Sequence, residues 1–274
     1  MNALSSIAVL ELKLGRRNRW MLLSTCALAL FALVLGFVGA SPTGSVRVDP
    51  LTVAVANLAT LSVYLVPLMA LLLAFDAIAG EVERGTIQLV LASPVSRTTL
   101  IAGKFIGHLT VLAIAIFIGY GLAGAAIYAF AGGSADGLIA VLRLMVTCIG
   151  LGAAFLALGY VASTLSRQSG TAAAFVVAIW LVAVVLYDLA LFGALVADAD
   201  GVFAKTIFPW LLIANPADAF RLFNMSMLET GAETSIGSVA GALPFPAWTG
   251  VVSLFVWTMG AFALSTLFLR RLEP

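Results

Sequence analysis

The sequence predicts an all-α integral membrane protein with six transmembrane helices. Hydrophobic residues make up 62% of the 274 residues and charged residues only 10%, whereas roughly a quarter of the residues are charged in an ordinary globular domain. The mean hydropathy is +1.13. Six apolar runs are each long enough to cross the hydrocarbon layer of a bilayer, which takes about 20 helical residues.

Residues 1–19 have the pattern of an amphipathic helix with a basic end. One helical face is formed by Leu4, Ile7, Leu10 and Leu14. Such a stripe is typical of a helix that lies along a membrane surface. The alternative is the n-region of a secretory signal, but the apolar run 20–39 is longer than the roughly 7–15 residues of a signal h-region. We therefore expect a cytoplasmic interfacial helix followed by a retained first span.

The other five spans are apolar runs bounded by turn signals or charges. They are expected at 51–75, 105–131, 138–165, 171–196 and 247–269. Pro67 lies inside the second span, where it is expected to kink a helix that neighbouring helices can still accommodate. The region 20–196 thus holds five spans and one long charged loop, and 247–274 holds the sixth span and the C-terminus.

Residues 197–246 are more polar and are interrupted by Gly and Pro. We expect a periplasmic segment with short helices. One of these helices begins at Asn215 and Pro216, because Asn is a favoured N-cap and Pro a favoured first helical residue. This helix is expected to end near Leu228.

The distribution of Lys and Arg predicts the orientation. Ten of the fourteen basic residues lie in the N-terminus, the 76–104 loop, the 166–170 turn and the C-terminus. Because cytoplasmic loops carry an excess of Lys and Arg, both termini are expected in the cytoplasm.

The loop 76–104 is the longest charged interruption in the first two thirds of the chain. Its charged residues are Asp76, Glu81, Glu83, Arg84, Arg97 and Lys104. A short amphipathic segment is expected from Thr86 to Leu91, and the Ser93-Pro94 step ends it. We interpret this loop as a handle that a cytoplasmic motor protein grips.

The sequence gives no indication of an enzyme. It contains no HExxH, G-x-S-x-G or Walker A motif. The single histidine, His108, lies at a predicted membrane boundary. Cys26 and Cys148 lie inside apolar runs, which favours neither a disulfide nor a zinc site. No basic patch with interleaved aromatic residues suggests nucleic acid binding, and no cofactor is expected on this chain.

Asp188 is the only ionisable residue of the fifth span. A carboxylate at that depth costs about 2.5–3.5 kcal/mol on insertion scales, so it is a candidate for a transport pathway or proton relay. Alternatively, it hydrogen-bonds Tyr187 or a polar group across a subunit interface, or lies near the outer boundary. The lack of a partner base favours this second interpretation.

Met225 and Met227 lie on the predicted outer segment. Thioethers suit the soft Cu(I) ion, so the pair is a candidate metal site. Residues at i and i+2 do not share a helix face, however, and two adaptable apolar residues packing against a partner are the alternative.

Glycines are spaced to allow close helix approach at Gly103 and Gly107 and again at Gly119, Gly121 and Gly124. Such spacing is consistent with dimerisation of membrane helices.

The loop 76–104 resembles the E-x-E-x-G-T…L-L-x-x-P-V-S-R…G-K pattern of the ABC-2 family of ATP-binding-cassette permeases. The matching residues are 81–86, 89, 91, 93–97 and 103–104. This resemblance implies an ABC-2 (type V exporter-like) permease fold and a homodimer. It also implies two cytoplasmic ATPase subunits, which hold ATP and Mg²⁺ and dock on the loop. The residues that would couple the ATPase to the spans are Glu81, Glu83, Arg84, Gly85, Thr86, Pro94, Ser96 and Arg97.

Within that family, the whole chain, including the N-terminal helix and the large outer segment, most resembles the permease subunits of nitrous oxide reductase maturation systems. The similarity implies a bacterial inner-membrane protein and a periplasmic β-helical partner that handles copper or sulfur for the copper clusters. Expected contacts of that partner are Phe220, Arg221 and Phe223. The alternatives are an ABC-2 exporter of another small molecule, an ion-coupled secondary transporter that uses Asp188, and a passive membrane anchor.

Overall fold

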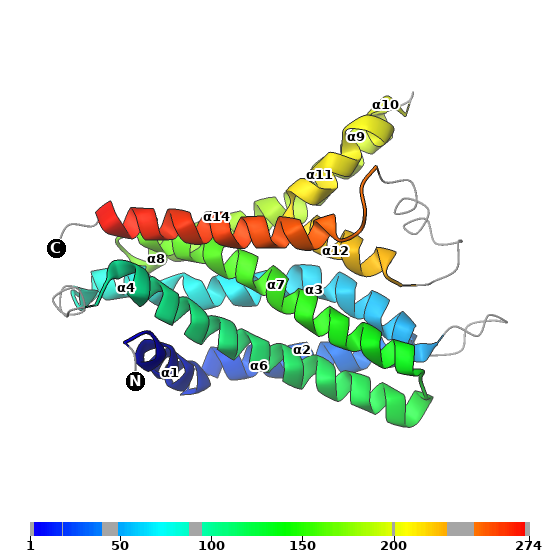
Figure 1. Ribbon diagram of the computed structural model, residues 1–274, viewed down its shortest axis with the longest axis horizontal. Helices are drawn as coiled ribbons and strands as arrows, with labels where there is room; N and C mark the ends of the chain where they lie inside the picture. Colours follow the sequence, from blue (N-terminus) through cyan, green and yellow to red (C-terminus); the bar gives the residue numbers. More distant parts are fainter. Residues whose placement is uncertain are drawn as a thin grey trace.

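The computed structural model describes residues 3–17, 19–39, 49–87, 95–198, 201–228 and 244–271, and no strand occurs among them. The described residues form helices joined by short turns (Figure 1). In chain order these are α1 (Ala3–Arg17), α2 (Arg19–Gly39), α3 (Pro50–Ala74), α4 (Asp76–Glu83), α6 (Arg97–Ala131), α7 (Ala135–Leu165), α8 (Ser169–Trp180), the π-helix η1 (Leu181–Leu186), α9 (Tyr187–Ala197), α10 (Val202–Thr206), α11 (Phe208–Ala214), α12 (Pro216–Ser226) and α14 (Thr249–Arg271).

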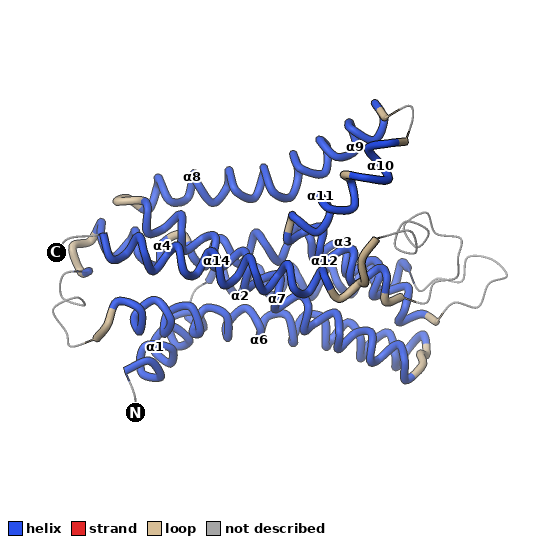
Figure 2. The backbone as a smooth tube through the Cα atoms, turned by 45° about the horizontal axis from the view of Figure 1, so that its top comes forward, coloured by secondary structure: helices blue, strands red, loops and turns tan. Residues whose placement is uncertain are grey.

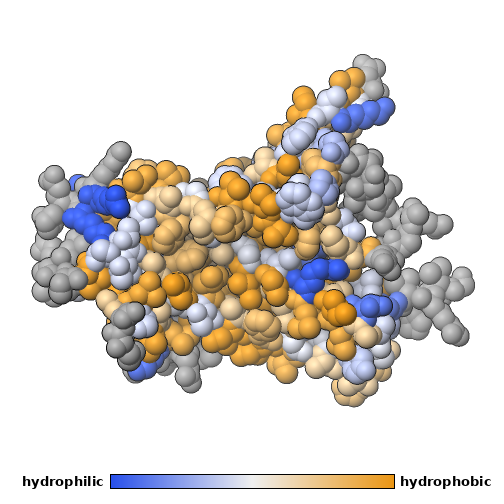
Figure 3. Space-filling view, in the orientation of Figure 1, coloured by the Kyte–Doolittle hydropathy of each residue, from blue (hydrophilic) through white to orange (hydrophobic). Residues whose placement is uncertain are grey.

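The predicted all-α membrane fold is confirmed. Five described helical stretches are long and apolar enough to cross a membrane, at Pro50–Glu83, Arg97–Ala131, Ala135–Leu165, Ser169–Ala197 and Thr249–Arg270. Helix α2, with its apolar part Thr25–Leu35, is a shorter sixth candidate. On the face seen in Figure 3, hydrophobic side chains cover the middle of the bundle and the hydrophilic ones gather toward its two ends.

The bundle has two distinct ends. Both termini and α4 lie at one end, which we call the α4 end, and α10 and α12 lie toward the other, which we call the α12 end (Figure 1). Helix α7 packs against α3, α6, α8 and α14 and forms the centre of the bundle. Helices α9, α10 and α11 project away from the bundle (Figures 1 and 2).

The segment expected to be a loop at 76–104 is largely helical, which corrects the sequence-based boundaries. Helix α3 passes into α4 at Phe75, and α6 begins at Arg97 rather than at Phe105. The early start of α6 follows from Ser96, whose side chain accepts a hydrogen bond from the Thr99 backbone N–H and caps the helix. The amphipathic segment predicted from Thr86 lies outside the described residues from position 88 onward.

The predicted helix start at Asn215 is confirmed, and the same side chain joins two parts of the fold. Its Oδ1 accepts from the Ala217 N–H at 2.9 Å, and Pro216 is the first helical residue. Its Nδ2 donates to the carbonyl of Ala183 at 2.6 Å, within η1. Asn215 therefore holds the start of α12 against the π-helical turn of the fifth span.

Glycines of α6 bring α1 into direct backbone contact within this chain. A Cβ added at Gly103 would lie 2.8 Å from Cβ of Ile7, and one added at Gly107 would lie 2.6 Å from Cβ of Glu11. A Cβ at Gly119 would meet Leu28 of α2. The predicted close approach is thus confirmed, but at these glycines it serves packing inside one subunit.

We expect Gly107→Ala to lower the free energy of unfolding by about 1–3 kcal/mol, because the new methyl group overpacks the α1–α6 contact. Gly260→Ala on α14 is the matched control, since nothing lies within 4 Å of a Cβ built there. That change should be neutral or stabilising by up to about 1 kcal/mol through helix propensity. Unfolding of the detergent-solubilised protein measures both, and equal effects would contradict the packing assignment.

Candidate functional site

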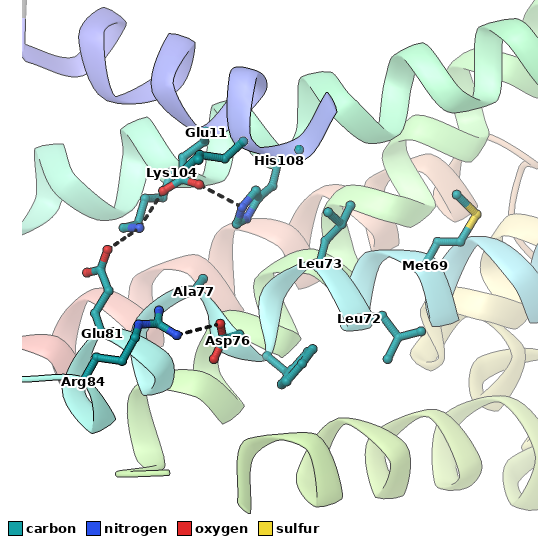
Figure 4. A pocket seen from close by; sticks show the side chains of 13 residues that line it. Glu11, Met69, Leu72, Leu73, Asp76, Ala77, Glu81, Arg84, Lys104 and His108 are labelled. Atoms are coloured by element: carbon teal, nitrogen blue, oxygen red, sulfur yellow. Dashed lines mark hydrogen bonds and ion pairs between the residues drawn. The ribbon is translucent and has the colours of Figure 1, made fainter. Parts of the chain in front are cut away.

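A buried ion-pair network joins α1, α4 and α6 at the α4 end. Nζ of Lys104 lies 2.6 Å from Oε1 of Glu11 and 2.8 Å from Oε1 of Glu81 (Figure 4). Lys104 is only 6% exposed and Glu11 8% exposed. A buried charge is tolerated when it is paired, so the one ammonium group binds two helices to α6.

His108 extends this network toward the centre of the bundle. Its Nε2 lies 3.3 Å from Oε2 of Glu11, and its Nδ1 lies 2.9 Å from the hydroxyl of Tyr160 on α7. The histidine is buried and both ring nitrogens have partners within the chain. This environment identifies His108 as a residue that connects α1, α6 and α7.

The electrostatics of Glu11 reflect this pairing. Burial alone would raise the pKa of the Glu11 carboxyl, but hydrogen bonds from His108 and Lys104 and the charge of Lys104 outweigh burial and lower it from 4.5 to about 2. Glu11 is therefore held in its charged form, as the pairing with Lys104 requires.

The exposed side of α4 is bonded to α8. Oγ of Ser169 donates to Oδ1 of Asp76 at 2.6 Å, and the Ser169 N–H donates to Oε2 of Glu83 at 2.9 Å. Asp76 also pairs with Arg84 at 3.4 Å. Because Ser169 is the first residue of α8, the Glu83 carboxylate satisfies a backbone N–H that the helix itself leaves free.

Two further contacts attach this region to α7 and α14. The fully buried Ser163 of α7 accepts hydrogen bonds from the N–H groups of Ile78 and Ala79, both at 3.0 Å, and donates to the carbonyl of Phe75. Arg97 donates to the carbonyls of Leu269 and Arg270 at the end of α14. Helix α4 and the start of α6 thus contact α1, α7, α8 and α14 through directional bonds.

A pocket of about 530 Å³ adjoins the network. Its polar wall includes Glu11, Asp76, Glu81, Arg84, Lys104 and His108, and its apolar wall includes Met69, Leu72 and Leu73 of α3 (Figure 4). The charged side chains therefore border a hollow on one side. Among the described residues, no group of three or more His, Cys, Asp and Glu side chains could hold a metal ion.

A second polar cluster lies between α9 and α12. Arg221 places Nη2 at 2.7 Å from Oδ2 of Asp188 and Nη1 at 3.2 Å from Oδ1 of Asp218. The expectation that Asp188 has no partner base is therefore wrong. The partner comes from the outer segment, 33 residues away in sequence, which an inspection of the spans alone could not find.

The predicted partner contacts on α12 have different environments. Phe220 is fully buried and Phe223 is 9% exposed, so the two rings belong to the interior of this subunit, which argues against their role as an exposed contact surface. Met225 packs partly buried against the core, whereas Met227 is 39% exposed. Cu(I) binding by the two methionines stays a prediction.

Comparison with known proteins decides the family. A family model described as ABC-2 family transporter protein matches residues 5–273, nearly the whole chain. The chain belongs to the ABC-2 transporter family.

Two similar relatives are described as probable ABC transporter permease protein NosY. The protein of Stutzerimonas stutzeri is 38% identical over 274 residues, which cover 99% of each chain. That of Pseudomonas aeruginosa is 38% identical over 268 residues, which cover 97% of each chain. The ABC-2 chain described here is accordingly an ABC transporter permease, a multi-pass membrane subunit.

The predicted coupling residues differ in exposure, and both partly buried and exposed ones have bonds within the chain. Glu81, Ser96 and Arg97 are occupied in contacts within the chain. Among the described residues, Glu83, Arg84, Gly85 and Thr86 form one continuous exposed edge at this end. Gly85 adopts a positive φ of 68°, a conformation that favours glycine. Pro94 lies outside the described residues.

Sequence reasoning missed the residues that anchor this site. Glu11 follows Leu4 and Ile7 by seven and four residues and so shares the helical face on which only apolar residues were expected. Ser163 and Ser169 carried no signal, because a serine in an apolar helix or turn is common. The position of Glu11 relative to Ile7 was the one available signal.

We expect Lys104→Met to lower the free energy of unfolding by about 3–5 kcal/mol, because it leaves the buried carboxylates of Glu11 and Glu81 without their cation. Arg84→Gln, which breaks the exposed pair with Asp76, should cost about 0–1 kcal/mol. Denaturant unfolding in detergent measures both. Adding Glu11→Gln and Glu81→Gln to Lys104→Met should restore stability in part, and an undiminished loss would contradict the electrostatic explanation.

Proposed function

We propose that this permease couples ATP hydrolysis by a cytoplasmic cassette ATPase to movement of its transmembrane helices. The observation that carries the proposal is the attachment of α4 and the start of α6 to α1, α7, α8 and α14. A push on α4 would therefore reach most of the bundle at once.

The proposed docking surface is the exposed edge from Glu83 to Thr86. These residues form the end of α4 and the turn that follows it, and they take no part in the Glu81–Lys104 ion pair. When the ATPase closes on ATP, α4 would move as a rigid body and tilt the helices bonded to it, in the manner of a shear motion between packed helices. The ion pair of Glu81 and Lys104 supplies rigidity, and the exposed residues 83–86 supply the contact surface, where Glu83 also bonds α8.

We further propose that the subunit works as a homodimer in the bacterial inner membrane, with both termini and α4 in the cytoplasm. Support for a second copy comes from the outward apolar surface. Only 17% of the most apolar stretch of Ser169–Ala197 and 22% of that of Thr249–Arg270 are buried, against 61% for α7. The fifth and sixth spans thus leave wide apolar faces for lipid and for a second subunit.

For the output we propose copper-cluster assembly of nitrous oxide reductase. The support is the sequence resemblance described above, together with two relatives named NosY that match over nearly the full length. The subunit would either move a sulfur or copper species across the membrane or act mechanically on a periplasmic β-helical partner at α10–α12. The relevant surface at the α12 end would be its exposed side chains, since Phe220 is buried.

We expect Thr86→Glu to abolish co-purification with the cassette ATPase, or to reduce ATP-dependent output at least tenfold, because a new charge enters the docking edge. The matched control is Ala135→Glu, at the exposed first residue of α7, outside both proposed contact surfaces. Both variants should insert and unfold like the wild type. Affinity purification of the complex and its ATPase activity provide the measurements.

Wild-type assembly and output in the Thr86→Glu variant would remove the edge 83–86 from the coupling role. An equal loss in Ala135→Glu would show that the effect does not depend on position at the α4 end.

A further inference from the structure

We propose that Asp188 and Asp218 together hold one proton, and that this proton fastens α12 to the fifth span. The two carboxyl groups flank one guanidinium group, that of Arg221, at 2.7 Å and 3.2 Å. Their side chains come from α9 and α12, which meet at the α12 end. This site is independent of the ATPase-docking surface at the other end.

Charge counting supports the proton. With both carboxyls ionised, the cluster would carry a net charge of −1 beside apolar spans, and one added proton makes it neutral. Asp218 is only 2% exposed, and among the described residues its Oδ2 has no hydrogen-bond partner. A buried carboxylate oxygen without a hydrogen-bond partner costs free energy of folding. Once it is protonated, the same oxygen donates a hydrogen bond, which the Asp188 carboxylate can accept.

The acid–base behaviour of Asp218 agrees with this geometry. Burial, and next the negative charge of Asp188, raise the pKa of the Asp218 carboxyl above 3.8, although Arg221 acts in the opposite direction. A hydrogen bond to Asp188 contributes further to the increase. Asp218 therefore keeps its proton at a pH where an exposed aspartate is ionised.

The other elements packed around the pair bring few titratable groups. Tyr187 from α9 and Tyr64 from α3 face the cluster. Helix α7 contributes Arg143, which instead bonds the carbonyl of Met227 past the end of α12. Lys205 of α10 is exposed. Helix α11 carries no titratable side chain, and α14 carries only arginines at its far end.

Loss of the proton would act on one contact of the fold, the joint at which α12 packs against the fifth span. Two uncharged contacts cross the same joint, from Asn215 Nδ2 to the Ala183 carbonyl and from the Tyr187 hydroxyl to the Leu211 carbonyl at 2.8 Å. They do not titrate at neutral pH, so among the described residues that cross this joint the carboxyl pair supplies the sensitivity to pH. An acidic exterior would tighten α12 against the fifth span, and an alkaline one would loosen it.

The test is an infrared pH-difference spectrum of the full chain in lipid nanodiscs, between about pH 5 and about pH 9. We expect the wild type to lose a protonated-carboxyl C=O band over this range, and Asp218→Asn to lack that change. Asp136→Asn, at an exposed residue of α7, is the matched control and should keep it. A band that persists in Asp218→Asn, or no band in the wild type, overturns the proposal.

Thermal unfolding gives a second readout. Because the pKa of Asp218 is raised in the folded state, the stabilising contribution of its proton is complete below pH 3.8. That contribution is lost as the pH rises through the folded-state pKa. The wild-type midpoint should fall on the order of 5 °C across the range, and that of Asp218→Asn should change less. Should Asp218→Asn not fold, Asp188→Asn serves, because removal of the Asp188 charge takes away one cause of the raised Asp218 pKa and shifts the loss of the band to lower pH. A wild-type band and slope retained in Asp188→Asn would equally refute a shared proton.

Discussion

The burial of one positive charge, that of Lys104, between carboxylates of two other helices is the constraint on which the α4 end depends. An ammonium group shielded from water requires its partners to stay in place, since their loss would leave it unpaired at a cost of several kcal/mol. Glu11 and Glu81 therefore fix the positions of α1 and α4 relative to α6. Apolar contacts could not do this alone, because they tolerate sliding that an ion pair of 2.6 Å does not.

The remaining bonds of this end have the same directional character. Ser163 engages three backbone groups at the α3–α4 junction, Glu83 completes the start of α8, and Arg97 binds carbonyls at the end of α14. Each contact uses a helix terminus or a junction, where backbone groups lack partners of their own. The helices are thereby joined at their ends while their middles meet lipid, which is the arrangement expected of a lever within a bilayer.

The sequence was sufficient for the fold class, the family and most spans, because length and hydropathy determine what crosses a membrane. It also located the 76–104 segment and the start of α12 at Asn215. It could not reveal Arg221 as the partner of Asp188 or Glu11 as the partner of Lys104, because each pair joins helices far apart in the chain. Periodicity predicts the faces of one helix, whereas these pairings depend on which helices become neighbours.

The π-helical turn η1 changes the phase of the fifth span. The backbone N–H of Tyr187 donates to the carbonyl of Val182, five residues earlier. The side chains of α9 are therefore rotated relative to the directions they would have if α8 had continued as an α-helix. A single helix can in this way turn one stripe of side chains to the lipid in its first half and a different stripe, including Asp188, to α12 in its second. If η1 instead continued as an α-helix with every residue kept, α9 would turn by about 100° and the carboxylate would point away from its guanidinium partner, whereas removing one residue from η1 would leave α9 in its present orientation.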